Sequence, residues 1–403
     1  MSKPLATRTT TPSAPPSSRT LIPYGRQWIE DDDVAAVEAV LRSDWLTTGP
    51  SVERFERAFA AAVGAREAVA VSNGTAALHT AMHALAIGPG DEVVVPPMTF
   101  AATANAVVYQ GGTPVFADVD SETLLLDPEA AAARVTSRTK AIAAVDYAGQ
   151  PCDYRPLRTL AERHGLRLVD DACHALGGRD GDQTVGTLAD LNTFSLHPVK
   201  PITSGEGGVI TTADPELARR MRVFRNHGIT TDHRQREAEG SWFYEMVELG
   251  FNYRLTDFQC ALGESQLRKL PAWVARRRAI ARRYDEAFAG NGLFAPLAVR
   301  PGVTHAHHLY VVQLRLERLR AGVGRREVFA ALRSAGIGVN VHYVPVHLHP
   351  YYRKRFGTGP GLCPRAEAAY ERILTLPLFA RMTDEQVATV IDTTLEVISS
   401  FAA

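Results

Sequence analysis

The chain has 403 residues, of which 45% are hydrophobic and 22% charged, a composition typical of globular proteins with a sizeable core. Lysine plus arginine equals aspartate plus glutamate at 44 each, so the overall charge gives no reason to expect binding to nucleic acid or to an anionic membrane. Four widely spaced cysteines without a CxxC pair, and no apolar run near the ~20 residues of a membrane span, favour a protein of the reducing cytoplasm.

The first twenty residues are rich in serine, threonine and proline and contain no acidic residue. This composition predicts a disordered tail over residues 1–20, although an organelle transit peptide shares some of the same bias. Folded structure is expected to begin near Leu21. We predict a large domain over residues 21–270 and a smaller α/β domain over residues 271–403.

Within the large domain, apolar runs typical of strands alternate with helical patterns from Glu67 onward. The predicted strands cover residues 67–72, 91–96, 113–119, 139–147, 166–172, 190–196 and 207–212. Alternation of strands and helices indicates an α/β fold with a mostly parallel sheet. Because the runs are apolar throughout, the strands are expected to be buried on both faces.

The smaller domain is predicted to open with a long amphipathic helix that begins near Pro271. Gly290, Asn291 and Gly292 follow the helix and are typical of a helix end. The remaining predicted elements are a strand at 308–316, a helix at 325–335, a strand near 338–344, and helices near 364–373 and 383–400.

Polar side chains follow several predicted strands at their carboxyl ends, where ligands bind in open parallel sheets. The sequence SNGT at 72–75 leads directly into a helix and predicts a phosphate cradle at the helix N-terminus. A simple cap by Ser72 or Asn73 explains this turn equally well. The other residues at this edge are Phe100, Asp170, Asp171, His174, Ser195, His197 and Lys200.

One cofactor requires all of these features together. Pyridoxal phosphate needs a lysine for its aldehyde, a carboxylate for its ring nitrogen, an aromatic neighbour and an anion site. A lysine against an apolar wall loses part of its proton affinity and becomes a nucleophile toward carbonyls. The sequence therefore predicts a pyridoxal-phosphate site around Lys200.

Other catalytic motifs are missing from the sequence. It contains no GxxxxGK[ST], no GxGxxG after a strand, no GxSxG and no HExxH. Histidines cluster at 305–310 and 342–352, which is a pattern that zinc sites can show. They lack cysteine or acidic partners at ligand spacing, so we predict no metal site.

The chain resembles the pyridoxal-phosphate sugar aminotransferases of the DegT/StrS type from IPYGRQ (22–27) almost to its C-terminus. The stretches that carry the resemblance are SDWLTTGP, VDYAGQ, DDACHALG, SLHPVKPITSGEGG, FRNHG, GFNYRLTDFQCALGESQL and VHYVPVH. Within the family, the strongest resemblance is to the aminotransferases of pseudaminic acid biosynthesis, which act on a UDP-linked 4-keto-6-deoxy-N-acetylhexosamine. The resemblance implies an aspartate-aminotransferase-like (fold type I) large domain, a small C-terminal α/β domain, and a homodimer with active sites at the subunit interface.

The resemblance also implies roles for individual residues. Lys200 matches the family's catalytic Schiff-base lysine, and Asp171 matches the carboxylate that pairs with the pyridine nitrogen. The further cofactor-binding residues that it implies are Gly74, Thr75, Phe100, His174, Ser195 and, from the neighbouring subunit, Asn252. The substrate contacts that it implies are Tyr24, Trp45, Leu46, Thr47, Thr48, His342 and Tyr343. Core packing remains an alternative role for Trp45.

The function implied is transfer of an amino group from L-glutamate to a nucleotide-linked 4-keto-6-deoxy sugar, with Lys200 as general acid and base. Arg254 is a candidate to hold the donor carboxylate, and a structural ion pair is the alternative. Arg26 and the run Arg276–Arg278 are candidates for contact with a diphosphate, with a solvated surface as the alternative.

Three other functions are compatible with the same fold. An aminotransferase for a TDP-linked keto sugar or a keto-cyclitol differs only in substrate. Pyridoxamine-dependent sugar dehydratases replace the lysine with histidine, so Lys200 disfavours that chemistry. A non-catalytic pyridoxal-phosphate regulatory protein is disfavoured because the stretches WLTT (45–48) and HYVP (342–345) are present and no DNA-binding extension is attached.

Overall fold

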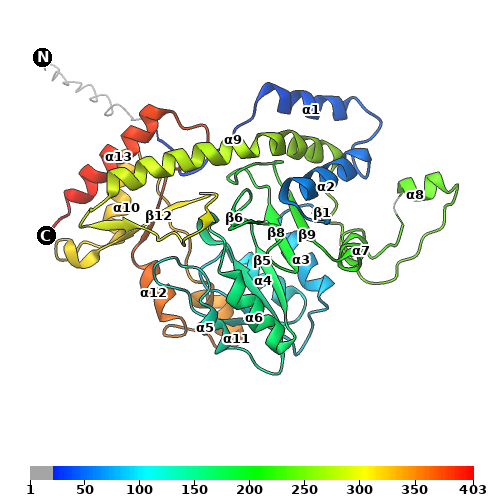
Figure 1. Cartoon of the computed structure of the whole chain (residues 1–403), viewed down its shortest axis with the longest axis horizontal. Helices are drawn as coiled ribbons and strands as arrows, with labels where there is room; N and C mark the ends of the chain where they lie inside the picture. Colours follow the sequence, from blue (N-terminus) through cyan, green and yellow to red (C-terminus); the bar gives the residue numbers. More distant parts are fainter. Residues whose placement is uncertain (1–20, 232) are drawn as a thin grey trace, which may run out of the picture.

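The computed structural model of the chain describes residues 21–231 and 233–403, and the predicted tail over residues 1–20 lies outside the described residues. Helices pack against a seven-stranded sheet, and the long helix α9 (Asp257–Phe288) runs from this region to a smaller α/β unit (Figure 1). The predicted α/β fold class is confirmed.

The large sheet has the strand order β1-β9-β8-β5-β4-β2-β3. Its strands are β1 (Glu67–Val71), β2 (Glu92–Val95), β3 (Thr113–Phe116), β4 (Thr139–Val145), β5 (Arg167–Asp171), β8 (Leu191–Ser195) and β9 (Gly208–Thr212). Strands β3, β2, β4, β5 and β8 run parallel to one another, whereas β9 is antiparallel to both β8 and β1. The parallel strands bring their carboxyl ends to one edge, where the predicted site residues follow.

The helices of the large region connect these strands, precede the first strand or follow the last. They are α1 (Asp31–Leu41), α2 (Pro50–Val63), α3 (Gly74–Ala84), α4 (Ala102–Tyr109), α5 (Pro128–Ala132), α6 (Tyr154–His164), α7 (Pro215–Phe224) and α8 (His233–Ala238). Local sequence sets several of their ends. For example, the side chain of Asn73 accepts a hydrogen bond from the N–H of Ala76 at 2.8 Å, and Gly64 ends α2 in the left-handed conformation that glycine favours.

Helix α9 is longer than the sequence pattern predicts. It begins at Asp257, after a capping box formed by Thr256 and Gln259, and continues through Pro271. The prediction that a helix begins near Pro271 is therefore wrong, and the predicted domain boundary at residues 270 and 271 falls inside α9. Burial explains the continuity, because the first half of α9 packs in the hydrophobic cluster beneath the large sheet and the second half packs in a separate cluster.

That separate cluster belongs to the smaller unit. Its sheet has the order β10-β12-β13, formed by β10 (Phe294–Pro296), β12 (Tyr310–Leu314) and β13 (Ile373–Leu376). Its helices are α10 (Arg325–Ser334) and α13 (Asp384–Ser399). Two further helices, α11 (Pro350–Phe356) and α12 (Pro364–Tyr370), pack instead in the cluster of the large sheet. Ile22 is buried in the same cluster, and its N–H donates to the carbonyl of Gly336 at 2.9 Å, so the first described residues pack with the C-terminal unit.

The strand predicted near 338–344 is not formed. Asn340 makes only an isolated bridge to Thr375, and the following residues leave the small sheet to line a cavity. A short sheet of β11 (Val303–Thr304), β6 (Arg179–Asp180) and β7 (Gln183–Thr184) joins the two regions on another side.

Arg277 of α9 connects the two regions through buried hydrogen bonds. Its guanidinium is 2% exposed, and Nη1 donates to the carbonyls of His307 at 3.2 Å and Leu378 at 3.0 Å. Burial lowers the pKa of Arg277 to about 10, and no carboxylate among the described residues pairs with it.

Replacing Arg277 is expected to reduce stability. The variant Arg277→Met keeps an apolar side chain but leaves buried carbonyls without a donor, so we expect the free energy of unfolding to fall by about 2–4 kcal/mol. Urea unfolding measures this change, and Arg278→Ala at the exposed neighbouring position is the matched control. Equal stability of the two variants would contradict the structural role of Arg277.

Candidate active site

A cavity of about 1120 Å³ lies at the carboxyl ends of β1, β5 and β8, where the large sheet meets the small unit. The predicted site residues that line it are Tyr24, Gly74, Thr75, Phe100, Asp171, His174, Ser195, Lys200, His342 and Tyr343. Residues from six separate sequence regions are thus gathered in the cavity that holds Lys200.

One wall of the cavity is the N-terminus of α3. Gly74 and Thr75 are its first two residues, whose backbone N–H groups have no partner within a helix. A Cβ atom at Gly74 would lie 2.9 Å from the Cβ and 3.2 Å from the hydroxyl of Ser195, so only glycine permits this close approach to β8. The wall therefore offers backbone donors and a hydroxyl for an anion such as a phosphate.

Lys200 lies in the loop between β8 and β9. Several hydrogen bonds hold this loop at Leu196, whose carbonyl accepts from the Thr203 hydroxyl at 2.8 Å and whose N–H donates to Gly207 at 2.8 Å. Burial lowers the pKa of Lys200, although Cys173 and Asp171 nearby partly oppose this change. A larger neutral fraction makes the amine a better nucleophile and base.

Asp171 is buried at the end of β5. Its Oδ2 accepts from the hydroxyl of Thr103 at 2.6 Å, and its Oδ1 accepts from the N–H of Cys173 at 3.3 Å. Thr103 was not predicted from the sequence. It belongs to α4, which follows β2, and β4 separates β2 from β5 in the sheet, so no spacing in the chain indicates the contact.

A buried group of rings forms another wall. Tyr343 and His174 share a hydrogen bond between the hydroxyl and Nε2 at 3.0 Å, and the rings of His174 and His308 lie 4.5 Å apart. Burial lowers the pKa of both histidines well below the usual value, so both are neutral near pH 7. In the sequence, His308 was noted only as part of a histidine cluster, and no role was predicted for it.

Among the described residues, no group of three or more His, Cys, Asp or Glu side chains could hold a metal ion.

These residues fit pyridoxal phosphate. The cavity combines a lysine of lowered proton affinity, a buried carboxylate held by two donors, and an anion cradle that a Cβ atom would close. The exposed ring of Phe100 and the buried ring of His174 supply the apolar surroundings of a planar cofactor.

Sequence comparison identifies the family. The profile of the DegT/DnrJ/EryC1/StrS aminotransferase family matches residues 27–395. The chain belongs to this family. It is therefore a pyridoxal-phosphate-dependent sugar aminotransferase, as the resemblance predicted.

Known proteins of similar sequence and structure span almost the whole chain. The spore coat polysaccharide biosynthesis protein SpsC of Bacillus subtilis is 42% identical over 380 residues, which cover 94% of this chain and 97% of SpsC. Spr1654 of Streptococcus pneumoniae in its PLP form is 32% identical with a TM-score of 0.87, covering 94% of this chain and 99% of that one. Helicobacter pylori PseC, an aminotransferase involved in the biosynthesis of pseudaminic acid, is 32% identical with a TM-score of 0.88, covering 95% and 100%.

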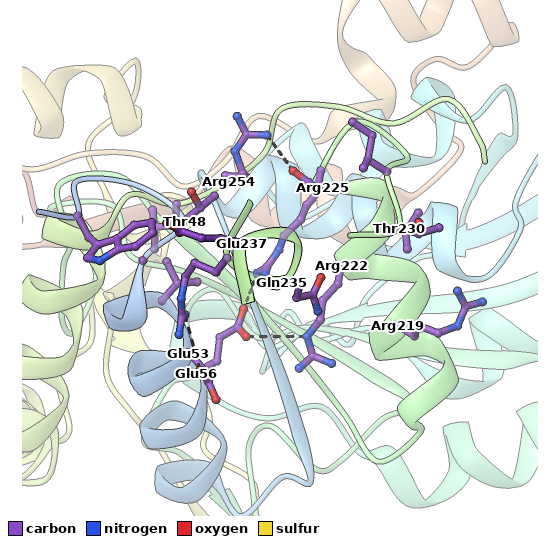
Figure 2. Close-up of a pocket in the computed structure, with 18 of the residues that line it drawn as sticks. Thr48, Glu53, Glu56, Arg219, Arg222, Arg225, Thr230, Gln235, Glu237 and Arg254 are labelled. Carbon is purple, nitrogen blue, oxygen red and sulfur yellow. Dashed lines mark hydrogen bonds and ion pairs between the residues drawn. The ribbon is translucent and has the colours of Figure 1, made fainter. Parts of the chain in front are cut away.

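Several residues with predicted roles lie outside the lysine cavity of their own chain. Trp45 and Thr48 line a second cavity of about 930 Å³, together with Arg254. Figure 2 shows Thr48 and Arg254 at one side of this second cavity and Arg219 at the other. Thr47 pairs with Thr256 in an isolated bridge beside it. Two further residues with predicted roles, Leu46 and Asn252, also lie outside the lysine cavity, and both are exposed.

The interactions of the candidate arginines differ. Arg254 donates to Asn226 at 2.9 Å and has no acidic partner among the described residues, so the alternative of a structural ion pair for Arg254 is not supported. The arginine run in α9 is not a free basic surface, because Arg276 is paired with Asp384 at 2.8 Å and Arg277 is buried. The burial of Arg277 excludes it from contact with a diphosphate, whereas such contact by Arg276 and Arg278 stays a prediction. Arg26 is exposed.

Proposed function

We propose that this aminotransferase transfers the amino group of L-glutamate to a UDP-linked 4-keto-6-deoxy-N-acetylhexosamine. The observation that carries the proposal is the meeting of Lys200, Asp171 and the N-terminus of α3 in one cavity. His342 and Tyr343 line the same cavity, at positions that the resemblance gives to sugar contacts. The similarity to PseC supports a substrate of this class.

Lys200, Asp171 and the residues of the phosphate cradle have separate roles in the proposed reaction. When bound, pyridoxal phosphate would supply an aldehyde carbon that takes up the amino group, and a ring that withdraws electrons. Lys200 Nζ takes a proton from the reacting carbon of the amino donor and later returns a proton to the reacting carbon of the keto sugar. Asp171, held by the hydroxyl of Thr103, presents a carboxylate to the ring nitrogen. Gly74, Thr75 and Ser195 bind the phosphate.

The amino donor is an anion that needs a cationic partner. Arg254 is a suitable group, because its guanidinium is bonded to an amide rather than to a carboxylate. It lines the second cavity and not the lysine cavity of its own chain. A role in binding glutamate therefore requires that the second cavity faces the lysine cavity of another subunit.

We propose a homodimer for this reason. Asn252 is two residues from Arg254, is exposed, and does not line the lysine cavity of its own chain. Figure 1 shows α8 and the segment after it projecting away from the rest of the chain. The apolar side chains of this segment are largely exposed, and they are Trp242, Phe243, Tyr244, Met246, Val247, Leu249 and Phe251. Exposed apolar side chains gathered in one segment are typical of a protein–protein contact.

The environment proposed for the enzyme is the cytoplasm. All four cysteines are unpaired, and three of them are buried. In the part of the chain that the structure describes, no helix is long and apolar enough to cross a membrane. The partners in this proposal are the nucleotide sugar, glutamate and a second copy of the chain, without nucleic acid.

The substrate proposal predicts a clear outcome in competition. The enzyme is offered glutamate together with UDP- and TDP-linked 4-keto sugars, and the amino-sugar products are measured by mass. We expect the UDP product to predominate. Preference for the TDP sugar, or turnover of a keto-cyclitol alone, would overturn the substrate and leave the transaminase chemistry intact. A deoxy product with free ammonia would instead indicate dehydratase chemistry.

A further inference from the structure

Two carboxyl groups that pair with no cation among the described residues lie behind Asp171. Asp146 comes directly after β4, and Asp170 is the last residue but one of β5. Both side chains are 0% exposed. The register of the two strands places Val145 opposite Asp171, and the N–H of Asp146 donates to the carbonyl of Asp171 at 3.2 Å. The two carboxyl groups are therefore fixed to the backbone that carries Asp171.

Most of the carboxyl oxygens of this pair have no hydrogen-bond donor. Oδ1 of Asp146 accepts from the N–H of Cys152 at 2.8 Å and from the hydroxyl of Tyr154 at 2.9 Å. Oδ2 of Asp146 and both oxygens of Asp170 are buried and accept no hydrogen bond of good geometry from the described residues, although the side chains of Tyr154 and Asp146 lie close to Asp170. Two ionised carboxylates would leave uncompensated charge in the core, which costs several kcal/mol per ion. A proton on the pair removes most of this cost.

The surrounding groups do not neutralise the pair. The titratable and charged groups that face it are Cys152, Tyr154, Asp171, Cys173, Asp180 and Arg300. The guanidinium of Arg300 is occupied elsewhere, by the carbonyl of Cys152 at 2.8 Å and the carboxylate of Asp153 at 3.1 Å. Burial raises the pKa of Asp146 to about 8, and burial followed by the charge of Asp146 raises the pKa of Asp170 well above its usual value.

We propose that Asp146 and Asp170 share one proton and act as positioning residues that limit the negative charge behind the carboxylate of Asp171. Neither residue lines the cavity. Successive side chains of a strand point to opposite faces, so Asp170 lies across the sheet from Asp171. A doubly charged pair at this place would repel the negative charge of the Asp171 carboxylate. A singly protonated pair limits that repulsion to one charge.

Infrared spectroscopy of the cofactor-free protein tests the shared proton directly. At pH 7 we expect the carbonyl stretch of a buried, protonated carboxylic acid. We expect the band to be lost in Asp170→Asn, because the new amide can donate to the ionised carboxylate of Asp146. Asp190→Asn is the matched control, since Asp190 of the same sheet region is paired with Arg158 at 2.7 Å, and this variant should keep the band. Absence of the band from the unmodified protein would overturn the proposal, whether or not a variant folds.

The pH dependence of unfolding gives a second measurement on the cofactor-free protein. An unfolded aspartate loses its proton near pH 4, whereas the folded pair keeps one proton into the neutral range. The folded state then binds more protons, so this contribution to stability is complete below about pH 4 and is lost as the pH rises toward the pKa of the folded pair. As the pH rises through this range, the unfolding constant of the unmodified protein should increase by up to about tenfold per pH unit relative to that of Asp170→Asn. Parallel pH profiles for the two proteins would overturn the proposal.

Cofactor binding tests the effect on Asp171. In Asp170→Asn the pair carries one negative charge throughout the neutral range, so the affinity for pyridoxal phosphate should lack the change that the unmodified protein shows as the pH rises through the pKa of the pair. Asp171→Asn removes the charge that faces the ring nitrogen and should lower the affinity by about 10- to 100-fold. The same pH profile of affinity in the unmodified protein and in Asp170→Asn would refute the positioning role. None of these measurements uses a sugar substrate, so they succeed or fail independently of the substrate proposed above.

Discussion

The variant Lys200→Ala is expected to lose at least about 10³-fold in the rate of transamination, because it removes both the amine that binds the cofactor aldehyde and the group that moves the proton. Loss of a cavity-lining amine should leave the fold intact, since the hydrogen bonds of the loop at Leu196 come from Thr203, Ser204 and Gly207. The measurement is single-turnover transfer from glutamate to the keto sugar, together with the absorbance of the bound cofactor.

A matched control separates this loss from a general effect of removing a lysine. Lys140 is an exposed lysine of β4 in the same sheet, and Lys140→Ala should keep the rate and the absorbance of the unmodified enzyme. The unmodified enzyme should be yellow and should lose its absorbance band when glutamate is added. Normal turnover by Lys200→Ala would remove Lys200 from the chemistry.

The sequence predicted the large sheet and the lysine cavity because both depend on local patterns. Each of the seven strands is an apolar run followed by a polar stretch, and parallel pairing brings those stretches to one edge. Asp171 and Lys200 end up in one cavity because β5 and β8 are neighbours with the same direction. Gly74 was implied by the resemblance, whereas the close approach to Ser195 that it permits could not be predicted from local sequence.

The errors arise where tertiary burial overrides a local signal. A proline usually marks a helix start, but at Pro271 the buried faces on both sides of it keep α9 continuous. Asn340 and its neighbours have the composition of a strand, yet only one bridge to Thr375 forms. Thr103 and His308 were missed because their partners come from elements that are distant in sequence, and neither carries a recognisable spacing.

Subunit mixing is expected to restore activity between two inactive variants, Lys200→Ala and Asn252→Ala. Asn252 does not line the lysine cavity of its own chain, and a cofactor phosphate carries close to two negative charges that need several donors. If Asn252 completes the site of a second copy, a hybrid dimer has one site that lacks both residues and one site that is intact. Random exchange makes half of the dimers hybrid, and each hybrid dimer has one intact site of two. About a quarter of all active sites should therefore work, which restores about a quarter of the activity of the unmodified enzyme.

The recovery depends on which chain supplies each residue, and this makes the experiment decisive. Mixing Lys200→Ala with Asp171→Ala should restore nothing, because both residues line the cavity of a single chain and each hybrid site then lacks one of them. Exchange of subunits is verified by mass spectrometry of differently tagged chains. Recovery in the control mixture would show that activity returns for another reason. No recovery with Asn252→Ala after verified exchange would place Asn252 and Lys200 in the same chain's site, and the exposed apolar segment that ends at Phe251 would then need another partner.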